Sequence, residues 1–404
     1  MTPFCYIAYP TSLTLKSANA IQTWSTLREL RALEPHTLAL IPRWRREPTR
    51  FDDVGAVHLP RPAIGKLSRL YHSTLWYYAE RSAFAAMCAA EIVRRRRNGQ
   101  QIAAVYVREV ICAAWWAAVY GPQLGLPVVY EAHDLESWNP SRAKERWAQP
   151  LLNLVDRVAL TRSTRVASLT DAFRGVLAQI DWRAPHDVDI IPDAYDPHLY
   201  YDRDQAGCRA ALGIAPGTQL VVYSGMSFAY RGLERLVDAL AALVPQHPDL
   251  RAVLVGGRPA EVAALVAQAA ALGIGERVTF TGQIAQEQTT QYLGAADLLV
   301  IPDTVTDVTA SPLKLFEYMA SARAIILPAI PALAEILPAH AGWYFTRGNT
   351  AALTTTLAAA LADPTARTQR AQSAARLVQQ HTYAARARRV IDSVRASMNT
   401  QMVL

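Results

Sequence analysis

The chain alternates short runs of apolar and β-branched residues with longer stretches in which apolar residues recur every three or four positions. The short runs are typical of buried parallel strands, and the longer stretches are typical of helices packed on them. In the first half we expect strands at Cys5 to Tyr9, Thr37 to Ile41, Val57 to Leu59, Ala104 to Val107, Val128 to Glu131, Arg165 to Leu169 and Val188 to Ile191. In the second half we expect them at Leu220 to Gly225, Ala252 to Gly256, Val278 to Thr281, Leu298 to Ile301 and Ala324 to Leu327. The pattern therefore predicts an α/β chain with two parallel sheets covered by helices.

Length and composition allow two cores and indicate a reducing environment. The chain has 404 residues, of which 51% are hydrophobic, enough for two domains. Its four cysteines are scattered, which is typical neither of a disulfide scaffold nor of a metal site. The N-terminus carries no basic region or cleavage site, and the apolar run from Ile111 to Val119 is too short to span a bilayer. We therefore expect a cytoplasmic protein.

The net charge of +7 predicts an anionic partner without identifying it. The basic run Arg94 to Arg97 precedes Asn98-Gly99 and most simply closes a long helix. The segment from Gly65 to Asn98 is expected to form one long helix or two shorter ones. Peripheral contact with an anionic membrane, at its inner face, is left open as the alternative. No nucleic-acid motif accompanies the basic residues, so we expect no nucleic acid partner.

The stretch from Thr309 to Ala320 combines the end of a buried strand with the start of a helix. Ser311 is the expected N-cap and Pro312 the first helical residue. A helix that starts there points its free N–H groups and the positive end of its dipole at a ligand, for which a phosphate is the natural candidate. Glu317 lies about 7.5 Å further along the axis, where its carboxylate could accept hydrogen bonds from a ribose. The alternative is an acid on a solvated helix face.

Two further loops follow predicted strands. His133, in Glu131-Ala-His-Asp134, lies at the end of a strand between two acids, and we weigh a functional role equally against a structural one. The loop from Pro10 to Ala20 carries Lys16, Ser17 and Asn19 before a helix, and a plain connecting loop is an equal alternative there. The chain has only four lysines against thirty-seven arginines, so Lys16 and Lys314 stand out as compact point charges in candidate site loops.

These motifs resemble those of the family 4 retaining glycosyltransferases. Ser311 to Ala320 (S-P-L-K-L-F-E-Y-M-A) is similar to the stretch that carries the second acid of the family's Glu-x7-Glu pair, and E-A-H-D is similar to its E-x-H-D element. Tyr223 to Gly232 resembles its strand-G-R-L-x-x-x-K-G element, with Arg231 at the lysine position. The chain departs from the family at Thr309, where the first acid should lie, and at Met226, where the arginine should lie.

The resemblance implies the GT-B fold, in which two Rossmann-like domains have parallel sheets facing across a cleft. By this resemblance the first domain comprises residues 1–197, joined by a C-terminal helix at about residues 383–404, and the second comprises residues 198–382. It implies catalytic roles for His133, Arg231, Lys314 and Glu317. It places the nucleotide sugar donor at Gly225, Arg231, Gln283, Ile284, Thr309, Ser311, Pro312, Leu313, Lys314 and Glu317. It places Lys16, Ser17 and Asn19 on the acceptor side, and it implies neither a metal nor a cofactor.

The resulting functional hypothesis is a retaining glycosyltransferase. It would move a sugar from a nucleotide diphosphate donor to a glycan, a lipid-linked or a small-molecule acceptor, in the assembly of a cell-surface glycan or exopolysaccharide. The alternatives are a GT-B epimerase or hydrolase that acts on the nucleotide sugar, and a non-catalytic nucleotide-sugar-binding partner subunit.

Overall fold

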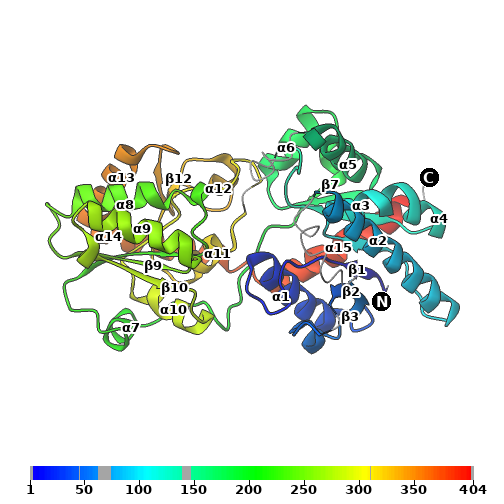
Figure 1. Cartoon of the computed structure of the whole chain (residues 1–404), viewed down its shortest axis with the longest axis horizontal. Helices are drawn as coiled ribbons and strands as arrows, with labels where there is room; N and C mark the ends of the chain where they lie inside the picture. The colour runs from blue at the N-terminus through cyan, green and yellow to red at the C-terminus, as the bar shows by residue number, and fades with distance from the viewer. Residues whose placement is uncertain (1–2, 45, 62–73, 139–146, 310, 402–404) are drawn as a thin grey trace. The chain divides into compact units, whose positions relative to one another are not determined.

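The chain folds into two compact units. The computed structural model describes residues 3–44, 46–61, 74–138, 147–309 and 311–401. Unit 1 comprises Met1–Pro192 with Tyr383–Leu404, and unit 2 comprises Asp193–Thr382 (Figure 1). The sequence predicts the boundary between the units after residue 197, a few residues beyond the boundary after Pro192 that the structure has. Within the described residues, no helix is both long enough and apolar enough to cross a bilayer.

Unit 1 contains a sheet of seven parallel strands in the order β3-β2-β1-β4-β5-β6-β7. The strands are β1 (Cys5–Ile7), β2 (Leu38–Arg43), β3 (Val57–Pro60), β4 (Val105–Val107), β5 (Val128–Ala132), β6 (Arg165–Ser168) and β7 (Val188–Ile190). All seven strands expected from the sequence are confirmed. Their apolar runs are continuous because both faces of this sheet are buried.

Helices cover both faces of this sheet. The core on one face joins the strands to α2, α3, α5 and α6, and the core on the other face joins them to α1 and α15. The helices are α1 (Ala18–Leu33), α2 (Thr74–Arg97), α3 (Val110–Trp115), α4 (Gly121–Leu124), α5 (Gln149–Arg162), α6 (Asp171–Gln179) and α15 (Tyr383–Gln401). A π-helical turn, η3 (Trp116–Tyr120), joins α3 to α4. The last helix of the chain therefore belongs to the first unit.

Unit 2 contains a sheet of six parallel strands in the order β10-β9-β8-β11-β12-β13. The strands are β8 (Gln219–Ser224), β9 (Leu250–Val255), β10 (Val278–Gly282), β11 (Leu298–Val300), β12 (Ala324–Pro328) and β13 (Trp343–Phe345). The five strands expected from the sequence are confirmed. The short edge strand β13, which pairs only with β12, was not predicted.

The helices of unit 2 form two layers. One core packs α10, α11, α12 and α14 on the sheet, and the other packs α8, α9 and α13 on the opposite face. The helices are α7 (Gln205–Ala211), α8 (Leu233–Leu243), α9 (Pro259–Ala271), α10 (Gln286–Ala295), α11 (Leu313–Ala320), α12 (Pro331–Ala334), α13 (Thr350–Ala362) and α14 (Pro364–Val378). Because the strands of this sheet are parallel, the carboxyl ends of β8, β9, β10 and β11 lie along one edge of the sheet.

The basic run Arg94 to Arg97 closes α2, as expected. Arg94 and Arg95 pair with Glu91 at 2.7 and 2.6 Å, and Arg96 donates to the carbonyls of Leu124 and Ile102. Gly99 then ends the helix with a φ of 84°. The earlier part of the predicted helix, residues 65–73, lies outside the described residues.

Candidate functional site

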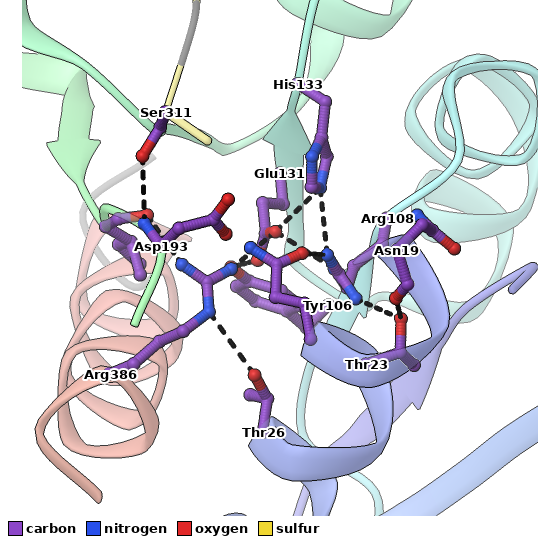
Figure 2. Close-up of polar contacts among 12 residues, drawn as sticks. Asn19, Thr23, Thr26, Tyr106, Arg108, Glu131, His133, Asp193, Ser311 and Arg386 are labelled. Atoms are coloured by element: carbon purple, nitrogen blue, oxygen red, sulfur yellow. Dashed lines mark hydrogen bonds and ion pairs between the residues drawn. The ribbon is translucent and has the colours of Figure 1, made fainter. Parts of the chain in front are cut away.

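Helix α11 begins one residue later than the sequence predicts. It starts at Leu313, with Pro312 at the N-cap in an extended conformation, so the prediction of Ser311 as N-cap was wrong. The Ser311 hydroxyl instead accepts a hydrogen bond from the Asp193 amide at 3.2 Å (Figure 2). Pro312 follows β11 and its polar loop, so α11 still begins beyond the carboxyl edge of the sheet.

The first turn of α11 has free backbone donors. The amide of Leu315 donates to the Pro312 carbonyl at 2.9 Å. Within the parts of the chain that the structure describes, the amides of Leu313 and Lys314 donate to no other group. Two unused donors at the positive end of a helix dipole favour an anion.

The Lys314 side chain is buried beside this turn. Its Nζ atom lies 3.9 Å from the centre of the Tyr223 ring, and a Cβ atom on Gly225 would lie 2.6 Å from it. Gly225, with a φ of 133°, therefore makes room for the lysine at the end of β8. Burial lowers the pKa of Lys314 well below its usual range, and the charge of Arg231 acts in the same direction.

Arg231 is the second cation of this edge. It ends the short turn η6 (Ala229–Arg231), where its Cζ atom lies 5.1 Å from the centre of the Tyr230 ring. Its Nε atom is buried without a hydrogen-bond partner. Other arginines nearby are paired, since Arg235 and Arg347 contact Asp303 at 2.5 and 2.7 Å.

The lack of a counter-ion sets these two cations apart. Among the residues with described positions, no carboxylate lies within ion-pair distance of Arg231 or Lys314. Two neighbouring cations that are partly or fully buried without an acid are costly unless an anion from outside joins them. The arrangement therefore favours a ligand with at least two negative charges.

Glu317 lies one turn further along α11. Burial raises the pKa of its carboxyl to about 7, although a hydrogen bond with Tyr200 and the charge of Lys314 oppose this shift. The side chain is half-buried, so its oxygens can reach a ligand. A carboxyl group with this pKa can accept hydrogen bonds from hydroxyl groups at neutral pH.

The remaining predicted donor residues follow the same edge. Gln283, after β10, donates from Nε2 to the Met226 sulfur at 3.4 Å, and Ile284 packs against the core. The Thr309 hydroxyl meets that of Thr306. Unit 2 thus brings together the loops that hold its predicted donor residues.

Unit 1 holds a buried polar network around Glu131 (Figure 2). Arg108 Nε and Arg386 Nη2 donate to Glu131 Oε1 at 2.9 and 2.6 Å, and the Tyr106 hydroxyl donates to Oε2. Burial alone would raise the pKa of Glu131, but the two guanidinium charges hold it well below its usual range. Glu131 therefore stays ionised, and both of its carboxylate oxygens accept hydrogen bonds.

His133 is attached to this network through one ring nitrogen. Its Nε2 atom lies 2.8 Å from Glu131 Oε1 and 3.0 Å from Arg108 Nη2 (Figure 2). Burial lowers the pKa of His133, and the charge of Arg108 acts in the same direction. We assign the proton to Nε2 because the carboxylate is the better acceptor. This leaves Nδ1, on a side chain that is 31% exposed, as an acceptor without a partner in the described parts of the chain.

The acceptor-side residues shape the loop before α1. Ser17 caps this helix by accepting from the Ala20 amide at 3.3 Å, and Asn19 Oδ1 accepts from the Thr11 amide at the same distance. The Lys16 side chain is exposed. Ser17, as the N-cap, and Asn19, in the first turn of α1, therefore have structural roles at the start of this helix.

Sequence reasoning missed Arg108, Arg386 and the anchoring role of Glu131. Arg108 directly follows β4, so its place at a strand end was a usable signal. Arg386 lies on α15, far along the chain, and no local pattern marks it among the other arginines of that helix. In the described part of the chain, no group of three or more His, Cys, Asp or Glu residues could hold a metal ion.

Comparisons with known proteins agree with this geometry. Residues 204–377 match the family "Glycosyl transferases group 1". The D-inositol 3-phosphate glycosyltransferase of Segniliparus rotundus is 30% identical over 185 residues, which span 45% of this chain and 41% of the relative. The match therefore covers less than half the length of that relative.

Solved structures match almost the whole chain. Sucrose-phosphate synthase from Thermosynechococcus elongatus has a TM-score of 0.76 and 20% identity, covering 98% of this chain and 99% of that one. Anabaena Alr3699/HepE in complex with UDP-glucose has a TM-score of 0.72 and 17% identity, covering 97% and 99%. Residues 204–377 thus belong to the glycosyl transferases group 1 family, within a chain that has the fold of GT-B glycosyltransferases.

Proposed function

We propose that the protein is a retaining glycosyltransferase that uses a nucleotide diphosphate sugar as donor. The observation that carries this proposal is the pair Arg231 and Lys314, which form no ion pair in the described parts of the chain and lie at the edge where α11 presents two free amides. A diphosphate supplies the negative charge that this edge lacks. The family match of residues 204–377 covers the same residues.

The donor lies on unit 2 in this proposal. Its ribose hydroxyls donate to Glu317, while the diphosphate contacts Arg231, Lys314 and the amides of Leu313 and Lys314. The base lies near Gln283 and Ile284 after β10. Since Alr3699/HepE was solved with UDP-glucose, UDP sugars are the first donors to test.

The reaction breaks the bond between the anomeric carbon and the diphosphate oxygen. The acceptor hydroxyl attacks the same face of the sugar and passes its proton to the leaving phosphate, so the configuration is retained. Glu131 is held by two arginines and a tyrosine, which makes it unsuitable as a nucleophile. The protein positions the partners and stabilises the charge that develops on the diphosphate. Neither step requires a metal or a cofactor.

His133 contributes from unit 1. With its proton fixed on Nε2 by Glu131, its Nδ1 atom can accept a hydrogen bond from a hydroxyl group of the transferred sugar. The acceptor molecule binds to unit 1, near Lys16, Ser17 and Asn19. We propose a glycan, a lipid-linked or a small-molecule acceptor, with polysaccharide assembly in the cytoplasm as the setting.

A thermal-shift screen of UDP, GDP and other nucleotide sugars identifies the donor. Binding of the matching nucleotide diphosphate should raise the melting temperature, while the nucleoside monophosphate should do so less because it offers a single phosphate. No shift with any nucleotide diphosphate would contradict the proposal.

Product analysis with the identified donor then separates the alternatives. The panel of acceptors includes monosaccharides, sugar phosphates and D-inositol 3-phosphate, the last named for the Segniliparus relative. Efficient turnover of donor without any acceptor would indicate an epimerase or a hydrolase. Tight donor binding without turnover under any condition would indicate a non-catalytic partner subunit.

A further inference from the structure

The exposed large hydrophobic residues of unit 1 are confined to one side of its sheet. Those with described positions lie on α2, α3 and α5 or in the segment before α5: Leu75, Trp115, Trp138, Trp147, Leu151 and Leu154. Helix α3 packs against both α2 and α5 (Figure 1). The other layer, α1 and α15, exposes no such residue within its described part. A concentration of this kind marks an interaction surface.

Helix α5 is apolar on two opposite faces. Leu152, Ala159 and Leu160 are the buried apolar residues on its inner face. Leu151, Leu154 and Val158 are spaced by three and four residues and so form a second stripe on the outer face. Trp147, 66% exposed, precedes the helix at the same spacing from Leu151. We call Trp147, Leu151, Leu154 and Val158 the α5 stripe.

The charged residues of α2, α3 and α5 give their outer surface one sign. Every acid on α2 and α5, and Glu109 at the N-cap of α3, has a buried side chain or a partner: Glu80 with Arg61, Glu91 with Arg94 and Arg95, Glu109 with Arg81, and Asp156 with the amides of Glu136 and Ser137.

The exposed charged residues of α2 and α5 are arginines in the described part of the chain. Arg157 and Arg162 flank the α5 stripe, and Arg97 ends α2. None of the three pairs with an acid in the part of the chain that the structure describes. An outer surface of tryptophan and leucine between unpaired arginines is complementary to anionic lipid headgroups above an acyl layer.

We propose that the α5 stripe, with Arg157 and Arg162, binds the surface of an anionic phospholipid bilayer. The tryptophan and the leucines enter the interface between headgroups and acyl chains, and the arginines contact lipid phosphates. Unit 1 then lies on the membrane without spanning it. This inference depends on the surface of unit 1 alone and would hold whatever reaction unit 2 supports.

Vesicle flotation of the full chain tests the proposal. The protein should float with vesicles of phosphatidylcholine and phosphatidylglycerol, should float much less with pure phosphatidylcholine, and should be released by high salt. Leu151→Gln with Leu154→Gln should weaken the partition coefficient by about tenfold or more. Arg157→Gln with Arg162→Gln should weaken it by a similar factor for anionic vesicles.

A matched control comes from unit 2. Val266 and Leu272 are 45% and 44% exposed, against 40% and 57% for Leu151 and Leu154, so Val266→Gln with Leu272→Gln removes a similar apolar area elsewhere. This control should float like the wild type. Circular dichroism checks the fold of each variant, and the salt dependence of the wild type remains as a readout if a variant fails to fold.

Three results would overturn the proposal. The first is no binding of the wild type to anionic vesicles. The second is an equal loss of binding in the α5 variant and in the control. The third is a dimer, seen by analytical ultracentrifugation, that the α5 variant abolishes while the wild type binds no vesicles, which would make the stripe an interface between two copies of the chain.

Discussion

Replacing Lys314 by methionine should separate binding from stability. Methionine keeps an unbranched side chain of similar length but removes a charge that is buried beside Arg231 and that forms no ion pair with a described residue. In the free protein this charge is repelled by its neighbour and is poorly solvated. In the complex, the same charge contacts the diphosphate. The substitution should therefore stabilise the free protein and weaken its binding of the ligand.

The two effects can be compared in magnitude. A charge-assisted hydrogen bond to phosphate contributes about 1.5 to 3 kcal/mol, so the affinity for UDP should fall by roughly 10- to 150-fold. In the free protein, an unpaired buried charge costs several kcal/mol. The contact of Nζ with the Tyr223 ring, at 3.9 Å, returns at most about 2 kcal/mol. The net change should raise the free energy of unfolding by about 1 kcal/mol or more.

Calorimetric titration with UDP and thermal unfolding measure the two quantities on the same samples. Arg251→Met is the control, because Arg251 is exposed on β9 of the same unit, and it should change neither quantity by much. A Lys314→Met protein that melts at a lower temperature and binds UDP as well as the wild type would refute this reasoning.

Further predictions concern protons, the sugar and metal ions. For Glu317, the folded pKa of about 7 exceeds the unfolded value of 4.5, so the native state binds more protons between these values and loses stability as the pH rises through them. Compared with the wild type, the Glu317→Gln protein should therefore have a higher melting temperature above pH 7 and nearly the same melting temperature below pH 4.5. It should also bind UDP more weakly. A melting temperature that depends on pH in the same way as that of the wild type would contradict the assignment. His133→Ala should lower the rate of sugar transfer more than the affinity for UDP, and equal losses would place His133 away from the sugar. Arg386→Met should shift the acidic limb of the plot of transfer rate against pH, because the substitution removes one of the two charges that lower the pKa of His133 and Glu131. A lower rate with an unshifted acidic limb would indicate a structural role for Arg386. Transfer should survive exhaustive chelation, since Arg231, Lys314 and backbone amides contact the diphosphate; a strict need for a divalent cation would count against this.

The strands and the two-unit organisation were predictable because burial on both faces leaves a continuous apolar run in the sequence. Ser311 shows the limit of local rules. Its position before a proline favours an N-cap, but its hydroxyl bonds the Asp193 amide, 118 residues away. The edge strand β13 is only three residues long and consists of three aromatic residues, so it has no clear alternation.

The two halves of the candidate site differed in how much the sequence revealed. Lys314 and Glu317 lie in one motif and could be identified together. The network around Glu131 joins Arg108 to Arg386, and their ion pairs with Glu131 span 23 and 255 residues of sequence. The absence of an ion pair to Arg231 or Lys314 among the described residues is likewise a three-dimensional property, which spacing along the chain does not encode.

The stereochemistry of acceptor-dependent transfer tests the central proposal most directly. The donor found in the thermal-shift screen is incubated with the acceptor panel, the product is identified by mass spectrometry, and its anomeric configuration is read by proton NMR. The proposal predicts a glycoside with the configuration of the donor, formed by the wild type and reduced about a hundredfold or more in the Arg231→Met protein. An inverted product, or one formed equally well by the correctly folded variant, would contradict it.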